Sequence, residues 1–352
     1  MPNSEFSNVL VKGIVSCVPQ TRIDNAALYE TFGESEIKKM SKLTGIESRP
    51  VVDDQTCTSD LCFQAAEELI TELDVDRSEI DGLVFISQTP DYILPPTSCV
   101  LQQRLGLSKD LAAFDVNLGC SGYTYGLWLA SSLLQGNLSK VLLLVGDTCS
   151  KFTSDQDRST FPLFGDAGTA TLIERGNSNP SYYVLGSNGE GSKDLIIKAG
   201  GFRDPRRGNA LPRVKGEDGN SRRDDELYMN GSEVFTFTIE TVHPLVESLL
   251  SFSGSSKDEV DSFVFHQANA FMLKHLGNKA KISPDKLPLT MNNFGNTSSA
   301  SIPLTICQKL PQAAKESLKL ALFGFGVGLS WGAALIDSES IELVKTVELV
   351  NR

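Results

Sequence analysis

Short runs of hydrophobic residues alternate along the chain with longer segments of helical periodicity. The runs predict strands and the segments between them predict helices. Strands separated by helices are typical of an α/β protein. Strands are expected at Val9–Cys17, Leu83–Ser87, Ala112–Val116, Val141–Val145, Phe263–Phe265, Leu318–Phe323 and Gly332–Ile336, and helices at Ser59–Leu73, Ser121–Leu134, Ser232–Phe252, Ala270–Leu276 and Ser298–Leu310.

The segment Ser121–Leu134 is apolar on nearly all sides, and Gly136 follows it as a helix cap. A helix without a polar face is a buried helix. We therefore expect this helix to lie inside the protein, covered by sheets.

Three blocks of sequence recur in the same order in the two halves of the chain. This order indicates a duplicated unit, with halves at about residues 1–180 and 181–352. With one buried helix in each half, the duplication predicts a five-layered αβαβα fold of the thiolase type. The matched blocks are Asp81–Phe85 with Asp261–Phe265, Asn117–Ser121 with Asn293–Thr297, and Gly168–Ile173 with Gly332–Ile336.

The matched blocks place a cysteine in the first half at the position that an asparagine occupies in the second half. Cys120 follows a predicted strand and precedes the buried helix, where the helix dipole stabilises a thiolate. Asn296 is its counterpart in the second half, and His266 ends the strand Phe263–Phe265. Active sites of α/β sheets gather at such strand ends, so Cys120, His266 and Asn296 are predicted to form one catalytic site.

Composition narrows the class of protein. The chain has 352 residues and a formal net charge of −12, which argues against nucleic acid or an anionic membrane as the partner. No apolar run approaches the ~20 residues of a membrane span, and the N-terminus lacks a signal core, so a cytoplasmic protein is expected. The seven cysteines are scattered without a CxxC pair, which predicts neither a disulfide framework nor a metal site.

Two segments allow alternative interpretations. Residues 199–227 are rich in glycine, proline and arginine without helical or strand periodicity, so they form either a solvated loop or a lid over a pocket that meets an anionic carrier or phosphate. The glycines of residues 324–328 resemble a phosphate loop, but position 329 is leucine and a strand is expected to follow. A turn that presents a backbone N–H to an oxyanion is the better interpretation.

Together these motifs resemble the β-ketoacyl-ACP synthase III (KAS III) family of thiolase-fold condensing enzymes. The resemblance spans about residues 9–337 and rests on three active-site motifs in the family's order, with two supporting strings. The active-site motifs are Gly119–Tyr123, the HQAN string at 266–269 and the GNTS string at 295–298, and the others are Phe164–Asp166 and Trp331–Gly332.

The resemblance implies a decarboxylative Claisen condensation of an acyl thioester with malonyl-ACP, giving a 3-oxoacyl-ACP. Cys120 is similar to the family's acylated nucleophile, and His266 and Asn296 to the pair that assists decarboxylation. The backbone N–H groups of Cys120 and Val327 would form the oxyanion hole. No cofactor and no metal are implied beyond the acyl-CoA or acyl-ACP and malonyl-ACP substrates.

The resemblance further implies a homodimer and a site for the substrate. Leu94 stands where the family often has an aromatic residue that reaches into the partner's acyl pocket. Arg158 matches an arginine that contacts the adenine of CoA, and Asn269, Gly326 and Gly328 are expected to line the substrate site. An acyl carrier protein is the implied macromolecular partner.

Three positions depart from the family. Lys39 and Leu43 stand where acetyl-CoA enzymes commonly have a tryptophan and an arginine that clasp the adenine, and Phe271 replaces an arginine used in carrier docking. These departures favour a specialised acyl group or a dedicated carrier over the priming of ordinary fatty-acid synthesis.

Three other functions fit parts of the pattern. An acyltransferase on the same fold would pass the acyl group to an alcohol or amine without decarboxylation. A papain-like protease would share the order Cys, His, Asn, but the context around its cysteine is missing here. A non-catalytic partner subunit would normally have lost the nucleophile that Cys120 provides.

Overall fold

A computed structural model describes residues 1–350 of the chain. Within these residues, strands from the first half of the chain and one strand from near the C-terminus build a six-stranded mixed sheet. The order of its strands is β17 (Leu343–Glu348), β2 (Val9–Val18), β8 (Asp166–Arg175), β7 (Lys140–Thr148), β5 (Gly82–Ile86) and β6 (Ala112–Val116).

The second sheet has five strands in the described part of the chain. Residues 262–265 pair in parallel with the next strand, and the other pairings are antiparallel. The order is β1 (Asn3–Phe6), β9 (Ser181–Ser187), β16 (Ser330–Asp337), β15 (Lys319–Gly326) and β14 (Ser262–Phe265).

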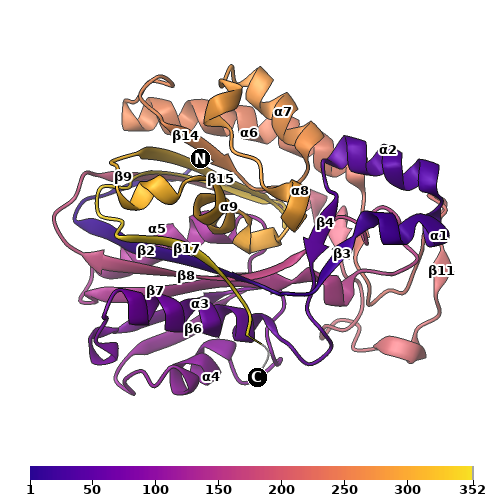
Figure 1. The fold of residues 1–352 in the computed structure, drawn as a ribbon, viewed down its shortest axis with the longest axis horizontal. Helices are drawn as coiled ribbons and strands as arrows, with labels where there is room; N and C mark the ends of the chain where they lie inside the picture. The colour runs from indigo at the N-terminus through magenta and orange to yellow at the C-terminus, as the bar shows by residue number, and fades with distance from the viewer. Residues whose placement is uncertain (351–352) are drawn as a thin grey trace.

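Helices form three layers around the two sheets (Figure 1). The central helices pack between the sheets, and their side chains join those of both sheets in one hydrophobic cluster. The outer faces of the first and second sheets are covered by separate helices. The central pair is α5 (Gly122–Leu134) and α9 (Ser301–Lys309), the first sheet carries α3 (Thr58–Glu72) and α4 (Thr97–Arg104), and the second carries α6 (Gly231–Ser253) and α7 (Ala270–Lys279).

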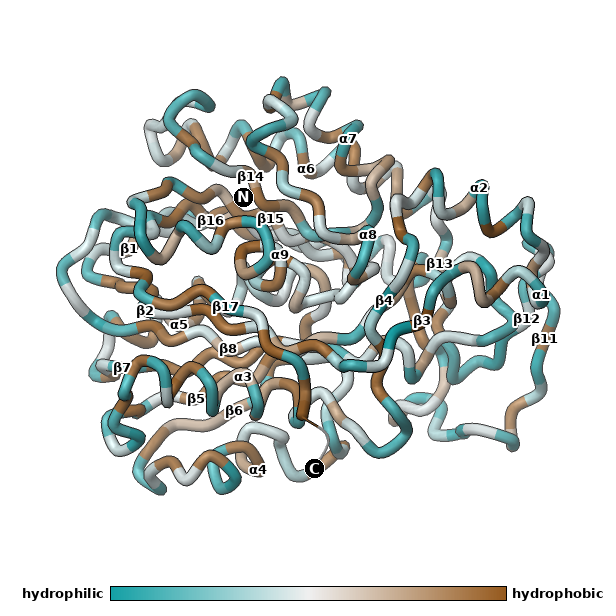
Figure 2. The backbone as a smooth tube through the Cα atoms, in the orientation of Figure 1, coloured by the Kyte–Doolittle hydropathy of each residue, from teal (hydrophilic) through white to brown (hydrophobic). Residues whose placement is uncertain are grey.

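This arrangement is the predicted αβαβα sandwich. The central position of α5 follows from its composition, because a Cβ on Gly126 would come within 2.8 Å of Ile86 and 2.9 Å of Leu143 in the sheet. Glycine lets the helix approach the strands closely. Hydrophobic residues accordingly follow the inner strands and helices in Figure 2, whereas the outlying region around α1, α2, β11 and β12 is largely hydrophilic.

Shorter elements surround the layered core. They are α1 (Tyr29–Phe32), α2 (Glu34–Thr44), α8 (Met291–Phe294), the strand pairs β3 (Arg22–Asp24) with β4 (Ser48–Pro50), β10 (Leu195–Ile196) with β13 (Tyr228–Met229) and β11 (Val214–Lys215) with β12 (Ser221–Arg222), and single 3₁₀ turns at Asn25–Leu28, Arg77–Glu79, Cys149–Phe152, Gly189–Gly191, Gly208–Ala210, Pro284–Lys286, Ser298–Ala300 and Pro311–Ala314. Among residues 1–350, no helix combines the length and the apolar character needed to cross a membrane.

The sheets share strands across the proposed boundary at residue 180. Strand β1, from the N-terminus, pairs with β9 in the second sheet, and β17, from the C-terminus, pairs with β2 in the first. The division into halves at 1–180 and 181–352 stays a prediction, and its last two residues lie outside the described part of the chain.

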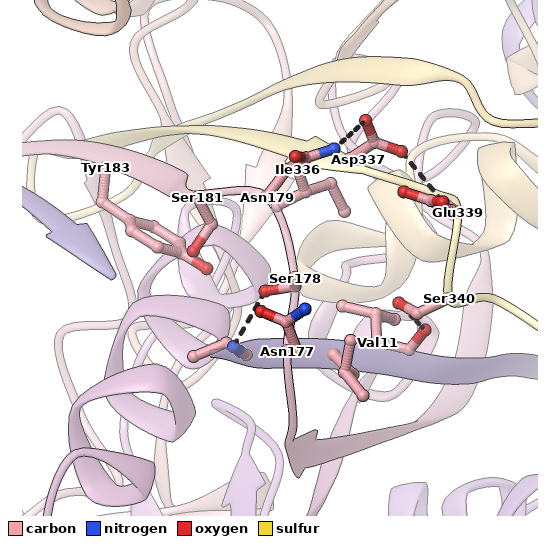
Figure 3. Close-up of a pocket in the computed structure, with 12 residues that line it drawn as sticks. Val11, Asn177, Ser178, Asn179, Ser181, Tyr183, Ile336, Asp337, Glu339 and Ser340 are labelled. Atoms are coloured by element: carbon pink, nitrogen blue, oxygen red, sulfur yellow. Dashed lines mark hydrogen bonds between the residues drawn. The ribbon is translucent and has the colours of Figure 1, made fainter. Parts of the chain in front are cut away.

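A cleft of about 410 Å³ opens between the ends of strands that belong to the two sheets (Figure 3). Its walls come from β2, the loop of residues 177–179, β9 and the end of β16. Asn179 Nδ2 donates to Asp337 at 3.2 Å, and Ser340 Oγ donates to the carbonyl of Val11 at 3.1 Å. None of the predicted site residues lines this cleft.

Candidate active site

One small cavity brings together the three residues that the sequence places in the site. It has a volume of about 100 Å³, and Cys120, His266 and Asn296 line it with Gly326. The remaining wall is mainly apolar and comes from α6, α7, β10 and the segment around Phe164. Residues from both halves of the chain therefore meet in one enclosed space.

Cys120 lies in the turn between β6 and α5, two residues before the helix begins. Across from it runs the end of β15, where a Cβ on Gly326 would lie 2.7 Å from the Cys120 Cβ and 2.8 Å from its sulfur. Only glycine fits this position without displacing the nucleophile. The next residue, Val327, also lies against the loop of the nucleophile, because a Cβ on Gly119 would come within 2.8 Å of its side chain.

Burial dominates the electrostatics of this thiol. It raises the pKa of Cys120 to about 11, and the charge of Asp147 acts in the same direction, while hydrogen bonds with the Val327 backbone and the Ser298 side chain oppose it. The sequence favours a stabilised thiolate because the cysteine precedes a helix. Desolvation by burial outweighs this effect, so the group is a thiol at neutral pH.

His266 follows the last residue of β14, as the sequence predicts. Its Nδ1 lies 2.7 Å from the hydroxyl of Ser301, and its ring meets Phe325 edge-on with the centroids 5.6 Å apart. Burial lowers the pKa of His266 to about 4, against a hydrogen bond with the Ser298 backbone that raises it. The imidazole is therefore neutral at physiological pH, and Nε2 is the ring nitrogen that Ser301 leaves for the cavity.

Asn296 is fixed by its backbone to the first half of the chain. Its N–H donates to the carbonyl of Leu163 at 2.8 Å, and its carbonyl accepts from the N–H of Gly165 at 3.1 Å. The side-chain Oδ1 accepts a hydrogen bond from the Ser298 N–H at 2.9 Å. With Oδ1 used in this way, the amide N–H groups are the ones that Asn296 has for a ligand.

A second, larger cavity lies behind Val327. It measures about 590 Å³ and is lined near the nucleophile by Gln88, Asn117 and Val327. Its far wall comes from residues 195–201, Arg207, Asp225 and Leu227, so part of the segment 199–227 encloses it. Leu195 lines both this cavity and the smaller one, which makes the two spaces neighbours.

The other predicted site residues differ in whether they line one of these two cavities. Asn269 lines the small cavity, and its Oδ1 also caps α7 by accepting from the Met272 N–H at 2.8 Å. Neither Leu94 nor Gly328 lines either cavity, and the Leu94 side chain is 77% exposed.

Arg158 and Phe271 lie outside both cavities. The Arg158 guanidinium pairs with Glu36 at 3.4 Å, with both side chains half exposed. Phe271 is 49% exposed and stacks on Phe235 with the ring centroids 5.7 Å apart.

Sequence reasoning missed three polar residues around the site. Ser301 contacts His266, Ser298 acts to lower the pKa of Cys120, and the buried Asp147 accepts a hydrogen bond from Ser299. An available sequence indication was the position of Asp147, an acid at the end of a long apolar strand. Among the described residues, no group of three or more His, Cys, Asp and Glu side chains is placed to hold a metal ion.

Comparison with known proteins decides the family. Residues 114–189 match the model of 3-oxoacyl-[acyl-carrier-protein (ACP)] synthase III, and residues 250–338 match the model of its C-terminal part. A putative 3-oxoacyl-[acyl-carrier-protein] synthase 3 of Campylobacter jejuni is 34% identical over 342 residues, which cover 96% of each chain. The chain belongs to the 3-oxoacyl-[acyl-carrier-protein] synthase III family. It is thus a condensing enzyme of the acyltransferase class, and a papain-like protease is excluded.

Solved structures agree with this KAS III assignment. The 3-oxoacyl-(acyl-carrier protein) synthase of Burkholderia xenovorans LB400 superposes with a TM-score of 0.93 at 42% identity and 99% coverage of both chains. OleA of Xanthomonas campestris, with cerulenin bound, superposes with a TM-score of 0.76 at 20% identity, covering 95% of this chain and 98% of its own. The OleA likeness shows the fold alone.

Proposed function

We propose that the protein condenses an acyl group, carried on Cys120, with a malonyl thioester on an acyl carrier protein. The observation that carries this proposal is the shared cavity of Cys120, His266 and Asn296. In the first half-reaction the Cys120 sulfur attacks the donor thioester and retains the acyl group. Loss of CO₂ from the malonyl thioester then gives an enolate, which attacks the acyl-Cys120 carbonyl.

His266 and Asn296 serve the decarboxylation step. The single proton of the neutral imidazole is placed on Nε2, with Nδ1 accepting from the Ser301 hydroxyl. In this tautomer His266 Nε2 and Asn296 Nδ2 both donate to the thioester oxygen as the enolate forms. Two fixed donors in a dry cavity stabilise developing negative charge without rearrangement of water. The backbone N–H groups of Cys120 and Val327 hold the oxyanion when the new C–C bond forms. The Val327 backbone acts to lower the pKa of the Cys120 thiol, which supports this role.

A specialised acyl group is the second part of the proposal. The cavity behind Val327 has room for it, and Gln88, Asn117 and Arg207 give its wall a polar character that a purely aliphatic chain would leave unused. Arg158 is paired with Glu36, and neither Lys39 nor Leu43 supplies an aromatic surface for an adenine ring. These features favour a dedicated donor over acetyl-CoA.

The protein acts as a homodimer in this proposal. The supporting observation is the segment Tyr92–Leu94, whose three side chains are 59%, 61% and 77% exposed. Large apolar side chains presented together to solvent mark an interaction surface. Light scattering on Leu94→Asp beside the wild type tests this arrangement, since a monomeric variant is expected only if this segment forms the interface.

The deciding experiment is the mass of the intact protein after incubation with a panel of acyl-CoA and acyl-carrier thioesters. One acyl group is expected on Cys120, and malonyl-ACP should then discharge it with release of one CO₂. Acyl transfer to an alcohol or amine without CO₂ would identify the non-decarboxylating acyltransferase instead. Absence of any adduct with the whole panel would refute the nucleophile and favour the non-catalytic subunit.

A further inference from the structure

Two buried serine side chains, one from each half of the chain, contact each other beside the nucleophile. Ser121 directly follows Cys120, and Ser330 begins β16. Their hydroxyl oxygens lie 2.7 Å apart, and the two residues are 1% and 4% exposed. The Ser330 hydroxyl also donates to the carbonyl of Val327 at 2.9 Å. A continuous chain of hydrogen bonds therefore connects the nucleophile loop to the turn that contains Val327.

The direction of this chain of hydrogen bonds follows from the number of protons. A hydroxyl has one proton to donate, and a carbonyl oxygen can only accept. Because the Ser330 proton is donated to the Val327 carbonyl, the Ser121 hydroxyl is the donor in the contact between the two serines. Both hydroxyls therefore donate within the protein.

Ser121 makes this contact instead of the one that its position favours. It is the N-cap residue of α5, where a serine side chain usually accepts a hydrogen bond from a backbone N–H of the first turn. Its side chain makes no such capping bond. The Ser121 hydroxyl thus joins the two halves of the chain and leaves the start of the helix uncapped.

The two loops that the serines join also approach each other closely. A Cβ on Gly324 would lie 2.8 Å from the Ser121 Cα, so only glycine allows this distance. Residues 327–329 form the turn between β15 and β16, and Gly326 pairs with Ser330 at the base of that turn. Ser330 therefore ties the first residue of the turn to its base, and Ser121 ties the base to the nucleophile loop.

We propose that Ser121 and Ser330 are positioning residues for the oxyanion hole. The backbone N–H groups of Cys120 and Val327 are the two proposed donors, and they belong to the two loops that the serines join. Two donors stabilise one oxygen best when their separation is fixed before the charge develops. The serines fix this separation through the backbone, without contact to a reacting atom. The inference rests on the proposed function, in which Cys120 is acylated.

The experiment compares two reactions of the same sulfur. Attack of Cys120 on a thioester forms an oxyanion, whereas its alkylation by iodoacetamide displaces iodide and forms none. The rates of acylation by the best thioester and of alkylation are both measured at Cys120 by peptide mass spectrometry. A change in the pKa of the thiol affects both rates. The ratio of acylation to alkylation therefore reports on the oxyanion hole.

Ser121→Ala, Ser330→Ala and the double variant break the chain of hydrogen bonds. Ser131→Ala is the matched control, because its hydroxyl makes a similar buried contact, at 3.0 Å, between α5 and the Tyr183 hydroxyl of the second sheet. The ratio should fall about tenfold in each single variant, since a displaced donor costs less than the roughly 10²–10³ of a removed one. It should stay near the wild-type value in Ser131→Ala. The double variant should lose no more than either single variant, because each change breaks the same link.

An unchanged ratio in Ser330→Ala would overturn the inference, whatever the absolute rates. Losses that multiply in the double variant would also overturn it, because the two hydroxyls would then act separately. The wild type distinguishes the two proposals. If no donor acylates it, the proposed function fails and the inference fails with it, whereas a wild type that acylates, with unchanged ratios in the variants, refutes the positioning role alone.

Discussion

The Nδ1 of His266 and the hydroxyl of Ser301 lie 2.7 Å apart, inside the protein and at the first turn of a central helix. The same hydroxyl accepts a hydrogen bond from the backbone nitrogen of Gln267 at 3.4 Å, which holds the hydroxyl in place. The held hydroxyl in turn fixes the rotation of the imidazole. Ser301→Ala should therefore lower malonyl decarboxylation about tenfold, the effect of losing one hydrogen bond, while acylation of Cys120 continues. Capture of labelled CO₂ measures the first rate and intact mass the second. Equal losses in both would show that Ser301 supports the whole site and not the imidazole alone.

Cys120 and His266 should divide the two half-reactions. Cys120→Ala is expected to abolish acylation, because no other thiol lines the small cavity. His266→Ala should still be acylated but should release CO₂ at least about a hundredfold more slowly, since one of two fixed donors is lost. Mass spectrometry of both variants with and without malonyl thioester gives the result. A His266→Ala protein that takes up no label would contradict the division.

Gly326 should not tolerate a side chain. In Gly326→Ala the new methyl group would meet the Cys120 sulfur at 2.8 Å, so the nucleophile must move. A displacement of this size is expected to slow acylation about a hundredfold. Gly189→Ala is the control, because nothing lies within 4 Å of the added Cβ there. Acylation at the wild-type rate in Gly326→Ala would mean that the cavity relaxes around the sulfur.

The buried imidazole should also make the free energy of unfolding depend on pH. Its pKa of about 4 lies below the ordinary value of 6.5, so the unfolded chain takes up a proton that the folded chain refuses. Stability is therefore lost as the pH falls through this window, by about 2 kcal/mol between about pH 7.5 and about pH 5. Burial raises the pKa of Asp166 to about 6, and this carboxyl acts with the opposite sign.

Urea unfolding at both pH values isolates the histidine. The difference between wild type and His266→Gln removes the contribution of Asp166, which is common to both proteins. His266→Gln should lose less stability on acidification than the wild type. A loss of equal size would show that His266 titrates normally in the folded protein.

The pair of Arg158 and Glu36 gives a test of the donor. If Arg158 binds the nucleotide of a CoA donor, Glu36 competes with it at 3.4 Å. Glu36→Gln should then lower the KM for acyl-CoA about two- to fivefold, the range expected for an exposed ion pair. Glu34→Gln is a matched control on the same helix, because Glu34 pairs with Lys38 instead. An unchanged KM in Glu36→Gln would remove Arg158 from the donor site.

The layered core was predictable because its signal is local and repeated. The helix expected at Ser121–Leu134 is α5, and the strand expected at Ala112–Val116 is β6 with the same bounds. The position of α5 follows from an apolar pattern that a water-exposed helix would not carry, whereas β6 is an edge strand and only partly buried. Because the blocks around Cys120 and Asn296 repeat, their convergence could be expected before any coordinates.

The peripheral elements could not be predicted in the same way. The segment 199–227 contains a 3₁₀ turn and the strands β11 and β12, yet its sequence has no apolar periodicity. Charge pairing helps to hold it in place, for example Arg213 with Glu226 and Arg222 with Asp157. It is thus neither a purely solvated loop nor a lid alone, since several of its residues also line the second cavity.

The polar residues that surround the nucleophile could not be predicted from the sequence either. Asp147 and Ser299 are separated by 152 residues, and nothing in either motif specifies the partner. Such a contact depends on how the two halves dock, which is set by the packing of α5 and α9 between the sheets. The sequence identifies Cys120, His266 and Asn296, which line one cavity, whereas the packing of the two halves determines which residues surround them.

The crossed placement of the terminal strands has a practical consequence. Since β1 completes the five-stranded sheet and β17 completes the six-stranded one, each end of the polypeptide supplies a strand to the sheet that is built mainly from the other half of the chain. Cutting the gene at the midpoint would leave each fragment with one orphaned edge strand and one missing one.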